Sequence, residues 1–203
     1  MRFIKNAVLG LTICTTLFAC NEEKKQEEKS TKKAEVLLPA PFKKHLKVEV
    51  GPELIFDIYS WGRGSDSSSS VLVLRSDSVK NEFSVASSDN LDGRLQEVFN
   101  TDMDTDGNPE IVILYTKNDK YNSAEVLCYE FSGKGANKIK FPDLTSKTKK
   151  QYRGLDKFYV KEGDLYREFN LYSETDTSNN TGKKMVLKYF LNRNQFDLNE
   201  IKE

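Results

Sequence analysis

The chain has 203 residues, with 31 basic and 31 acidic side chains, one histidine and three cysteines. This balance of charge argues against a nucleic-acid-binding protein, because neutralising phosphates requires a net basic surface. The single histidine, His45, excludes any site that needs two imidazole groups. Twelve Phe and nine Tyr supply enough large side chains for the hydrophobic core of one domain of this length.

The start of the chain has the pattern of a secretory signal peptide. Arg2 and Lys5 precede an apolar stretch, residues 7–19, that contains no acidic residue. The stretch is shorter than the roughly 20 residues that cross a membrane. Residues 17–20, LFAC, resemble the lipobox of bacterial lipoproteins, in which the peptide is cleaved before the cysteine and the cysteine is lipidated. The resemblance implies a signal peptide over residues 1–19 and a lipid on Cys20; the alternative is an ordinary signal peptide with a coincidental cysteine.

Residues 21–34, NEEKKQEEKSTKKA, contain no large apolar side chain. Such a segment cannot bury enough surface to offset the entropy of ordering it, so residues 20–34 are predicted to be a flexible, lipid-anchored tether. The acidic residues just after the cysteine resemble surface-export signals of lipoproteins in some Bacteroidetes. Together these resemblances imply a protein anchored through Cys20 in the outer membrane of a cell envelope, at its periplasmic face or at the cell surface.

Residues 35–203 are predicted to form one all-β domain, antiparallel and β-sandwich-like, with at most one short helix. Short apolar runs alternate with turn residues, and the connections are too short for parallel crossovers. The predicted helix lies within residues 143–151. Breaks rich in Gly, Asn, Asp or Ser include residues 89–93, 102–109 and 133–137. The predicted strands are 54–61, 71–76, 83–87, 95–100, 111–115, 124–131, 158–160, 165–172, 184–191 and 195–201.

The most specific motif is the acidic segment 102–110, DMDTDGNPE. Carboxylates at alternate positions followed by a glycine let a tight loop direct several oxygen atoms at one centre, as Ca²⁺ requires. The segment is not an EF-hand, because Ile113 stands where that loop needs a bidentate glutamate. It resembles the strand-flanked calcium loops of FG-GAP and related β repeats, and the alternative is an Asp-rich turn without an ion. The predicted ligands are Asp102, Asp104, Asp106, Asn108 and Glu110.

A wider resemblance rests on several short segments in a fixed order. They are FDIY at 56–59, the strand ending at 83–85, Asp92-Gly93, the acidic loop ending in PEIV at 109–112, a loop reaching Tyr121, and the later segments 152–158, 167–172 and 181–182. Over roughly residues 54–191 this combination is similar to the periplasmic inhibitors of invertebrate-type lysozyme and to related uncharacterised lipoproteins. The later segments are similar to a C-terminal extension of those relatives.

In that family a loop of the form Ser-Gly-x-x-Tyr enters the lysozyme cleft. The corresponding segment is 116–123, TKNDKYNS, in which Tyr121 matches the aromatic position, while Asn and Asp stand in place of Ser and Gly. A lysozyme cleft carries two catalytic carboxylates, which the donors of the segment would meet. The resemblance thus implies an inhibitory loop, degenerate in motif, that consists of Lys117, Asn118, Lys120 and Tyr121; the alternative is a polar hairpin tip.

The resemblance implies a non-catalytic envelope protein that plugs the cleft of a lysozyme or another peptidoglycan hydrolase through the Tyr121 loop. The alternative function is a calcium-stabilised structural or adhesion-like surface lipoprotein without inhibitor activity. A third class, an envelope hydrolase, would need two facing carboxylates, and a chain with this many acidic residues does not reveal such a pair. Membrane attachment through the lipid on Cys20 is expected, and a nucleic-acid partner is not.

Overall fold

The computed structural model describes residues 37–65, 68–176 and 178–201. From Leu37 onward the chain forms one compact unit. The predicted signal peptide, the lipidation site Cys20 and the predicted tether lie outside the described residues. None of the helices in the described part of the chain is long and apolar enough to cross a membrane.

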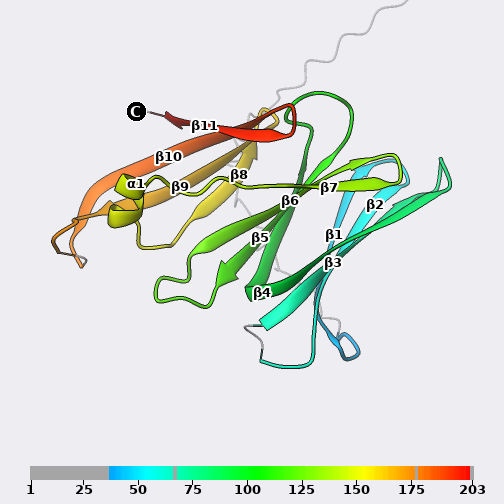
Figure 1. Cartoon of the computed structure of the whole chain (residues 1–203), viewed down its shortest axis with the longest axis horizontal. Helices are drawn as coiled ribbons and strands as arrows, with labels where there is room; N and C mark the ends of the chain where they lie inside the picture. The colour runs from blue at the N-terminus through cyan, green and yellow to red at the C-terminus, as the bar shows by residue number, and fades with distance from the viewer. Residues whose placement is uncertain (1–36, 66–67, 177, 202–203) are drawn as a thin grey trace, which may run out of the picture. The chain divides into compact units, whose positions relative to one another are not determined.

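The domain is all-β and antiparallel, as predicted, with eleven strands and one short helix among the described residues (Figure 1). A seven-stranded sheet follows chain order: β1 (Phe42–Gly51), β2 (Leu54–Trp61), β3 (Ser68–Asp77), β4 (Glu82–Thr101), β5 (Glu110–Lys117), β6 (Ala124–Ser132) and β7 (Gly135–Ile139). A four-stranded sheet has the order β11-β10-β9-β8, with β8 (Lys157–Lys161), β9 (Asp164–Tyr172), β10 (Asn180–Asn192) and β11 (Gln195–Ile201). The helix α1 (Ser146–Gln151) connects the two sheets, within the range predicted for it, and the side chain of Thr145 caps its first turn.

The long strand β4 belongs to two pairings. Residues 82–92 pair with β3, and residues 93–101 pair with β5. The two halves of the sheet face each other across a first core, in which the ring of Phe56 on β2 meets that of Phe131 on β6 with centroids 4.8 Å apart. The predicted break at residues 89–93 is therefore wrong. Hydrogen bonds to two different neighbours, together with burial of Leu91 and Leu95, keep this polar stretch extended.

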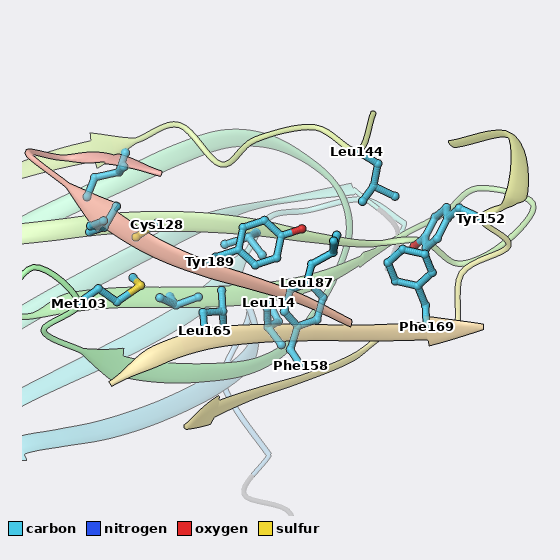
Figure 2. Packing of buried hydrophobic residues seen from close by; sticks show 14 residues of the cluster. Met103, Leu114, Cys128, Leu144, Tyr152, Phe158, Leu165, Phe169, Leu187 and Tyr189 are labelled. Carbon is cyan, nitrogen blue, oxygen red and sulfur yellow. The ribbon is translucent and has the colours of Figure 1, made fainter. Parts of the chain in front are cut away.

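Strands β5 and β6 lie between strands β1–β3 and the four-stranded sheet (Figure 1), and they contribute side chains to both cores. Ile111 and Ile113 face the first core, whereas Val112 and Leu114 face the second, against the four-stranded sheet. This explains why β5 is continuously apolar and does not alternate. Figure 2 shows the second core, where Cys128 is fully buried. Burial raises the pKa of its thiol, which keeps it protonated and unreactive.

Strands β1 and β7, at the two ends of the seven-stranded sheet, are not among the predicted strands. In β1 only alternate residues such as Leu46 and Val48 pack against the core, and the charged residues Lys47 and Glu49 alternate with them. In β7 a single large apolar residue, Ile139, is buried. The predicted break at 133–137 consequently shrinks to the turn at residues 133–134. End strands carry polar residues that mask their strand pattern.

Candidate functional site

The acidic loop joins β4 to β5. Thr105 and Gly107 both have positive φ, +57° and +84°, and so the backbone turns twice within a few residues. As a result, carboxylate oxygens of Asp102, Asp104, Asp106 and Glu110 all lie within 4.8 Å of one another. Like charges this close repel one another unless a cation or a proton lies among them. The cluster can therefore hold a metal ion, and it contains four of the five predicted ligands.

Glu110 is the buried member of the cluster, with 0% of its surface exposed. Its Oε2 accepts hydrogen bonds from Thr101 Oγ1 at 3.0 Å and from the Met103 amide at 2.8 Å. Its Oε1 has no hydrogen-bond partner among the described residues. Burial raises the pKa of Glu110 to about 7, and the charges of the loop aspartates add to that increase. A buried carboxylate with an unsatisfied oxygen costs free energy, and a positively charged partner would remove that cost.

The remaining loop residues fix the directions of the aspartates. The Gly107 amide donates to Asp102 Oδ2 at 3.1 Å. Asn108 donates to Asp106 from both its amide and its side chain, each at 2.8 Å. Asn108 thus orients Asp106 through two hydrogen bonds from its nitrogen atoms, and its predicted role as a ligand through an oxygen atom stays a prediction. Asp104 Oδ1 is buried and has no hydrogen-bond partner in the described region, so this oxygen, like Glu110 Oε1, is unsatisfied.

Sequence reasoning missed Glu130, a fifth acidic residue beside this cluster. It lies opposite Glu110 in the β5–β6 register and is 3% exposed. Its Oε1 accepts a hydrogen bond from Asn194 Nδ2 at 3.1 Å, and Asn194 belongs to the turn between β10 and β11. Burial raises the pKa of Glu130, and the charges of Asp106 and Asp104 raise it further. The acidic cluster is therefore linked to the second sheet, through strand pairing that no local motif reveals.

The predicted inhibitory loop is the connection between β5 and β6. The Asp119 carboxylate accepts hydrogen bonds from the amides of Tyr121 (3.0 Å) and Ser123 (2.9 Å) and from the Ser123 hydroxyl (2.6 Å). The Lys120 ammonium lies 5.1 Å from the centre of the Tyr121 ring, and the Arg153 guanidinium lies 5.4 Å from it on a separate segment. The structure thus places Lys120 beside the Tyr121 ring and adds Arg153, which is not among the predicted loop residues.

The other two predicted loop residues do not share this arrangement. Asn118 lies exposed at the hairpin tip. The Lys117 ammonium bonds to Glu125 Oε1 at 2.6 Å, across the two strands and back from the tip. Lys117 is therefore neutralised within the hairpin and does not extend the cationic group around Tyr121.

The backbone of this hairpin passes so close to Gly154 that a side chain does not fit there. Gly154 has a φ of +75°, and a Cβ atom at this position would lie 2.1 Å from the Tyr121 carbonyl oxygen. We expect Gly154→Ala to cost about 1–3 kcal/mol more in free energy of unfolding than Gly163→Ala. Gly163 is a matched control, because its φ is +86° and a Cβ atom added there would meet no other atom within 4 Å. Urea unfolding of both variants measures the difference. Equal losses of unfolding free energy would show that the Tyr121 carbonyl leaves room for a side chain at position 154.

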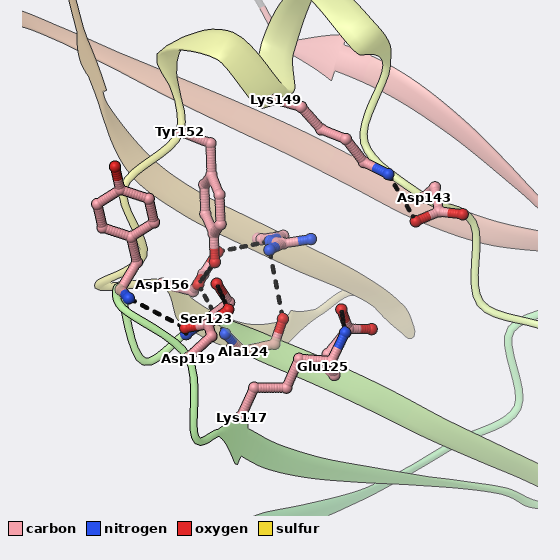
Figure 3. A network of polar contacts seen from close by, with 11 residues as sticks. Lys117, Asp119, Ser123, Ala124, Glu125, Asp143, Lys149, Tyr152 and Asp156 are labelled. Carbon is pink, nitrogen blue, oxygen red and sulfur yellow. Dashed lines mark hydrogen bonds and ion pairs between the residues drawn. The ribbon is translucent and has the colours of Figure 1, made fainter. Parts of the chain in front are cut away.

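A buried ion pair supports the base of the hairpin (Figure 3). Arg167 Nε lies 2.6 Å from Asp156 Oδ1, and the two side chains are 6% and 0% exposed. The Tyr152 hydroxyl and the Ala124 amide donate to Asp156 Oδ2. The guanidinium also lies over the rings of Tyr152, Phe158 and Phe169, at 5.1, 5.3 and 5.4 Å. This network fastens β9 of the second sheet to the start of β6.

The pocket above this network is mixed in charge. It has a volume of about 360 Å³, and Lys117, Glu125 and Arg167 contribute to its walls. Burial raises the pKa of the Tyr152 phenol, and its hydrogen bond to Asp156 raises it further, so the hydroxyl stays a hydrogen-bond donor. Arg167 and Asp156 neutralise each other's charge, so the role of this ion pair is structural.

Comparisons of the chain with protein-family models, with curated proteins and with solved structures gave no match.

Proposed function

We propose that the chain is a non-catalytic binding domain that is stabilised by a calcium ion in the acidic loop. One observation carries this proposal: Glu110 is fully buried, and its Oε1 lacks a hydrogen-bond partner among the described residues. Three aspartate carboxylates converge on the same place. A cation bound there would neutralise the buried charge and satisfy the orphaned oxygen, which the loop's own hydrogen bonds do not do.

The donor set favours calcium over other common metals. All four clustered groups are carboxylates, and hard oxygen ligands suit Ca²⁺, whereas Zn²⁺ and copper prefer nitrogen or sulfur. Ca²⁺ accepts six to eight ligands in flexible geometry, and Mg²⁺ demands a near-ideal octahedron. An irregular loop that turns at Thr105 and Gly107 is better suited to the less demanding ion.

Calcium binding should stabilise the fold, because Glu110 begins a central strand and Met103 of the same loop packs in the second core. We expect a higher melting temperature in millimolar Ca²⁺ than in chelator, since a ligand that binds only the folded state shifts the unfolding equilibrium. Circular dichroism melts of the purified protein measure the shift. Equal melting temperatures in calcium and in chelator would refute this stabilisation.

A second candidate function is inhibition of a lysozyme or another peptidoglycan hydrolase through the Tyr121 hairpin. The observation that favours it is a pre-ordered tip: Asp119 fixes the turn, and Lys120 and Arg153 flank the Tyr121 ring. A rigid cationic and aromatic tip complements a cleft with two carboxylates, and pre-ordering lowers the entropic cost of binding.

Titration into invertebrate-, chicken- and goose-type lysozymes tests the inhibitory candidate. We expect inhibition of one type by the unaltered protein, its loss in Tyr121→Ala, and its retention in Tyr159→Ala. Tyr159 is a suitable control because it stacks on Tyr166 in the second sheet, outside the hairpin. If no lysozyme is inhibited, this candidate fails, while the calcium proposal is unaffected.

We also propose that the domain is lipid-anchored at the outer membrane through Cys20, because residues 17–20 resemble a lipobox. Cys20→Ser should move the protein from the membrane fraction to the soluble fraction of the cell envelope. Cys14→Ser is the matched control, since Cys14 lies within the predicted signal peptide and should leave membrane attachment unchanged. Membrane retention of Cys20→Ser would contradict the anchor.

A further inference from the structure

A pocket of about 400 Å³ opens beside β1 and the second half of β4. It shares no lining residue with the acidic loop or with the Tyr121 hairpin. Three of its described lining residues are cationic, Lys43, Lys44 and Arg94, and none is acidic. The nearby Asp92 and Glu97 are not among them, and Glu97 lines a different pocket.

Backbone carbonyl groups fix the two lysines. The Lys44 ammonium donates to the carbonyls of Leu95 and Gln96, both at 2.9 Å, where an irregularity in the β4–β5 register turns the backbone. The Lys43 ammonium donates to the carbonyls of Ser65 at 2.6 Å and Ser68 at 2.9 Å. The carbonyl groups that hold the Lys43 ammonium carry no net charge, so they do not neutralise it. Since an ammonium has three protons, Lys43 keeps one donor for a ligand.

Arg94 supplies the remaining cation. It is exposed on β4, and it forms no ion pair or hydrogen bond with another side chain in the residues that the structure describes. A guanidinium presents a planar fork of donors that matches the oxygens of a phosphate or a carboxylate. Ser60 and Ser69, both buried, also line the pocket and add neutral hydroxyl groups.

We propose that this pocket is a binding site for a small oxyanion, a phosphate or carboxylate group, held by the Arg94 fork and the Lys43 ammonium. The Lys43 ammonium and the Arg94 guanidinium line one concave surface, where their positive potentials add. The volume is at the lower end of the range for small-molecule sites, so the anion belongs to a compact ligand. This inference is independent of calcium binding and of lysozyme inhibition.

Isothermal titration of the purified protein tests the site, with inorganic phosphate, glucose 1-phosphate, glucuronate and neutral glucose as probes. We expect saturable binding of at least one anionic probe and none of glucose. Inorganic phosphate binding as tightly as the sugar derivatives would indicate a free oxyanion as the ligand. Tighter binding of glucose 1-phosphate or glucuronate would indicate a sugar-borne one.

Charge variants locate the binding. We expect Arg94→Gln to weaken the binding of the best probe about tenfold, the effect of losing a charge-assisted hydrogen bond, and Lys43→Gln to weaken it as well. Lys134→Gln removes an exposed charge from the β6–β7 turn and should have no effect. Melting temperatures confirm that the variants are folded. The proposal is overturned if no anionic probe binds at millimolar concentration, or if Arg94→Gln and Lys134→Gln weaken binding equally.

Discussion

Replacement of Asp156 by alanine should lower the free energy of unfolding by about 3–5 kcal/mol, the usual cost of leaving one partner of a buried ion pair uncompensated. Arg167 would remain almost fully buried without its carboxylate partner, and the Ala124 carbonyl, at 3.4 Å, is a distant hydrogen-bond acceptor for it. The Tyr152 hydroxyl and the Ala124 amide would also lose their acceptor. Urea unfolding followed by circular dichroism measures the change.

Two further variants show whether the loss in Asp156→Ala comes from burial of the ion pair or would follow from breaking an exposed pair as well. Asp143→Ala breaks a pair with Lys149 at the same pocket (Figure 3), but Asp143 is 77% exposed, so solvent screens the pair and stability should hardly change. The double variant Asp156→Ala/Arg167→Met should recover part of the loss, because it removes the stranded charge as well. A loss in Asp156→Ala no larger than that in Asp143→Ala would contradict a buried, structural pair.

The second large effect is a dependence of the free energy of unfolding on pH, which arises from the raised pKa of Glu110. In the unfolded chain its carboxyl ionises near the ordinary pKa of 4.5, and in the calcium-free fold its pKa is about 7. Between these values the folded state binds more protons than the unfolded state, so stability falls as the pH rises and levels off above about pH 7. The span corresponds to about 3 kcal/mol, at about 1.4 kcal/mol for each unit of pKa.

The effect of Glu110→Gln on the free energy of unfolding should therefore have opposite signs in chelator and in calcium. In chelator at about pH 8 the variant should be more stable than the unaltered protein, because an amide carries no charge to bury. In calcium the order should invert, because the unaltered carboxylate gains a cation and the amide does not. Urea unfolding in both buffers measures this, with Glu200→Gln on the exposed face of β11 as the control. An unchanged order in the two buffers would be incompatible with Glu110 as a calcium ligand.

The sequence predicted those elements whose pattern is local. Residues 54–61 and 195–201 match β2 and β11 in both bounds, because alternating apolar residues end at clear turns. The continuity of β4 depends on two different partner strands, and a stretch of polar residues in its middle masked it. The end strands β1 and β7 gain order mainly from their neighbours, which a window of sequence does not contain.

In the candidate sites, too, the residues that are close in sequence could be predicted, and those that meet only in the fold could not. The acidic cluster could be predicted because its four carboxylates lie within residues 102–110. Glu130 and Asn194 approach it only through strand pairing and sheet packing. The one local hint for Glu130 is a charged residue between Tyr129 and Phe131 in a buried strand. Arg153 likewise reaches Tyr121 from a segment after α1.

The acidic loop and the Tyr121 hairpin lie at opposite ends of β5. The strand has eight residues, and at about 3.4 Å for each residue it separates the two sites by roughly 25 Å. An ion in the loop would therefore not touch a partner bound at the hairpin. For this reason the calcium and lysozyme experiments can fail separately, and each result bears on its own proposal.

Calcium titration of the chelator-treated protein, followed by calorimetry, shows whether the acidic loop binds the ion. We predict saturable binding to one site, at least tenfold weaker binding in Asp104→Asn, the size of change that follows from loss of a charged ligand, and unchanged binding in the control Asp197→Asn on β11. Asparagine keeps the shape of the loop side chain and removes its charge. The absence of saturable binding, or equal affinities in the unaltered protein and Asp104→Asn, would contradict a calcium site in the acidic loop.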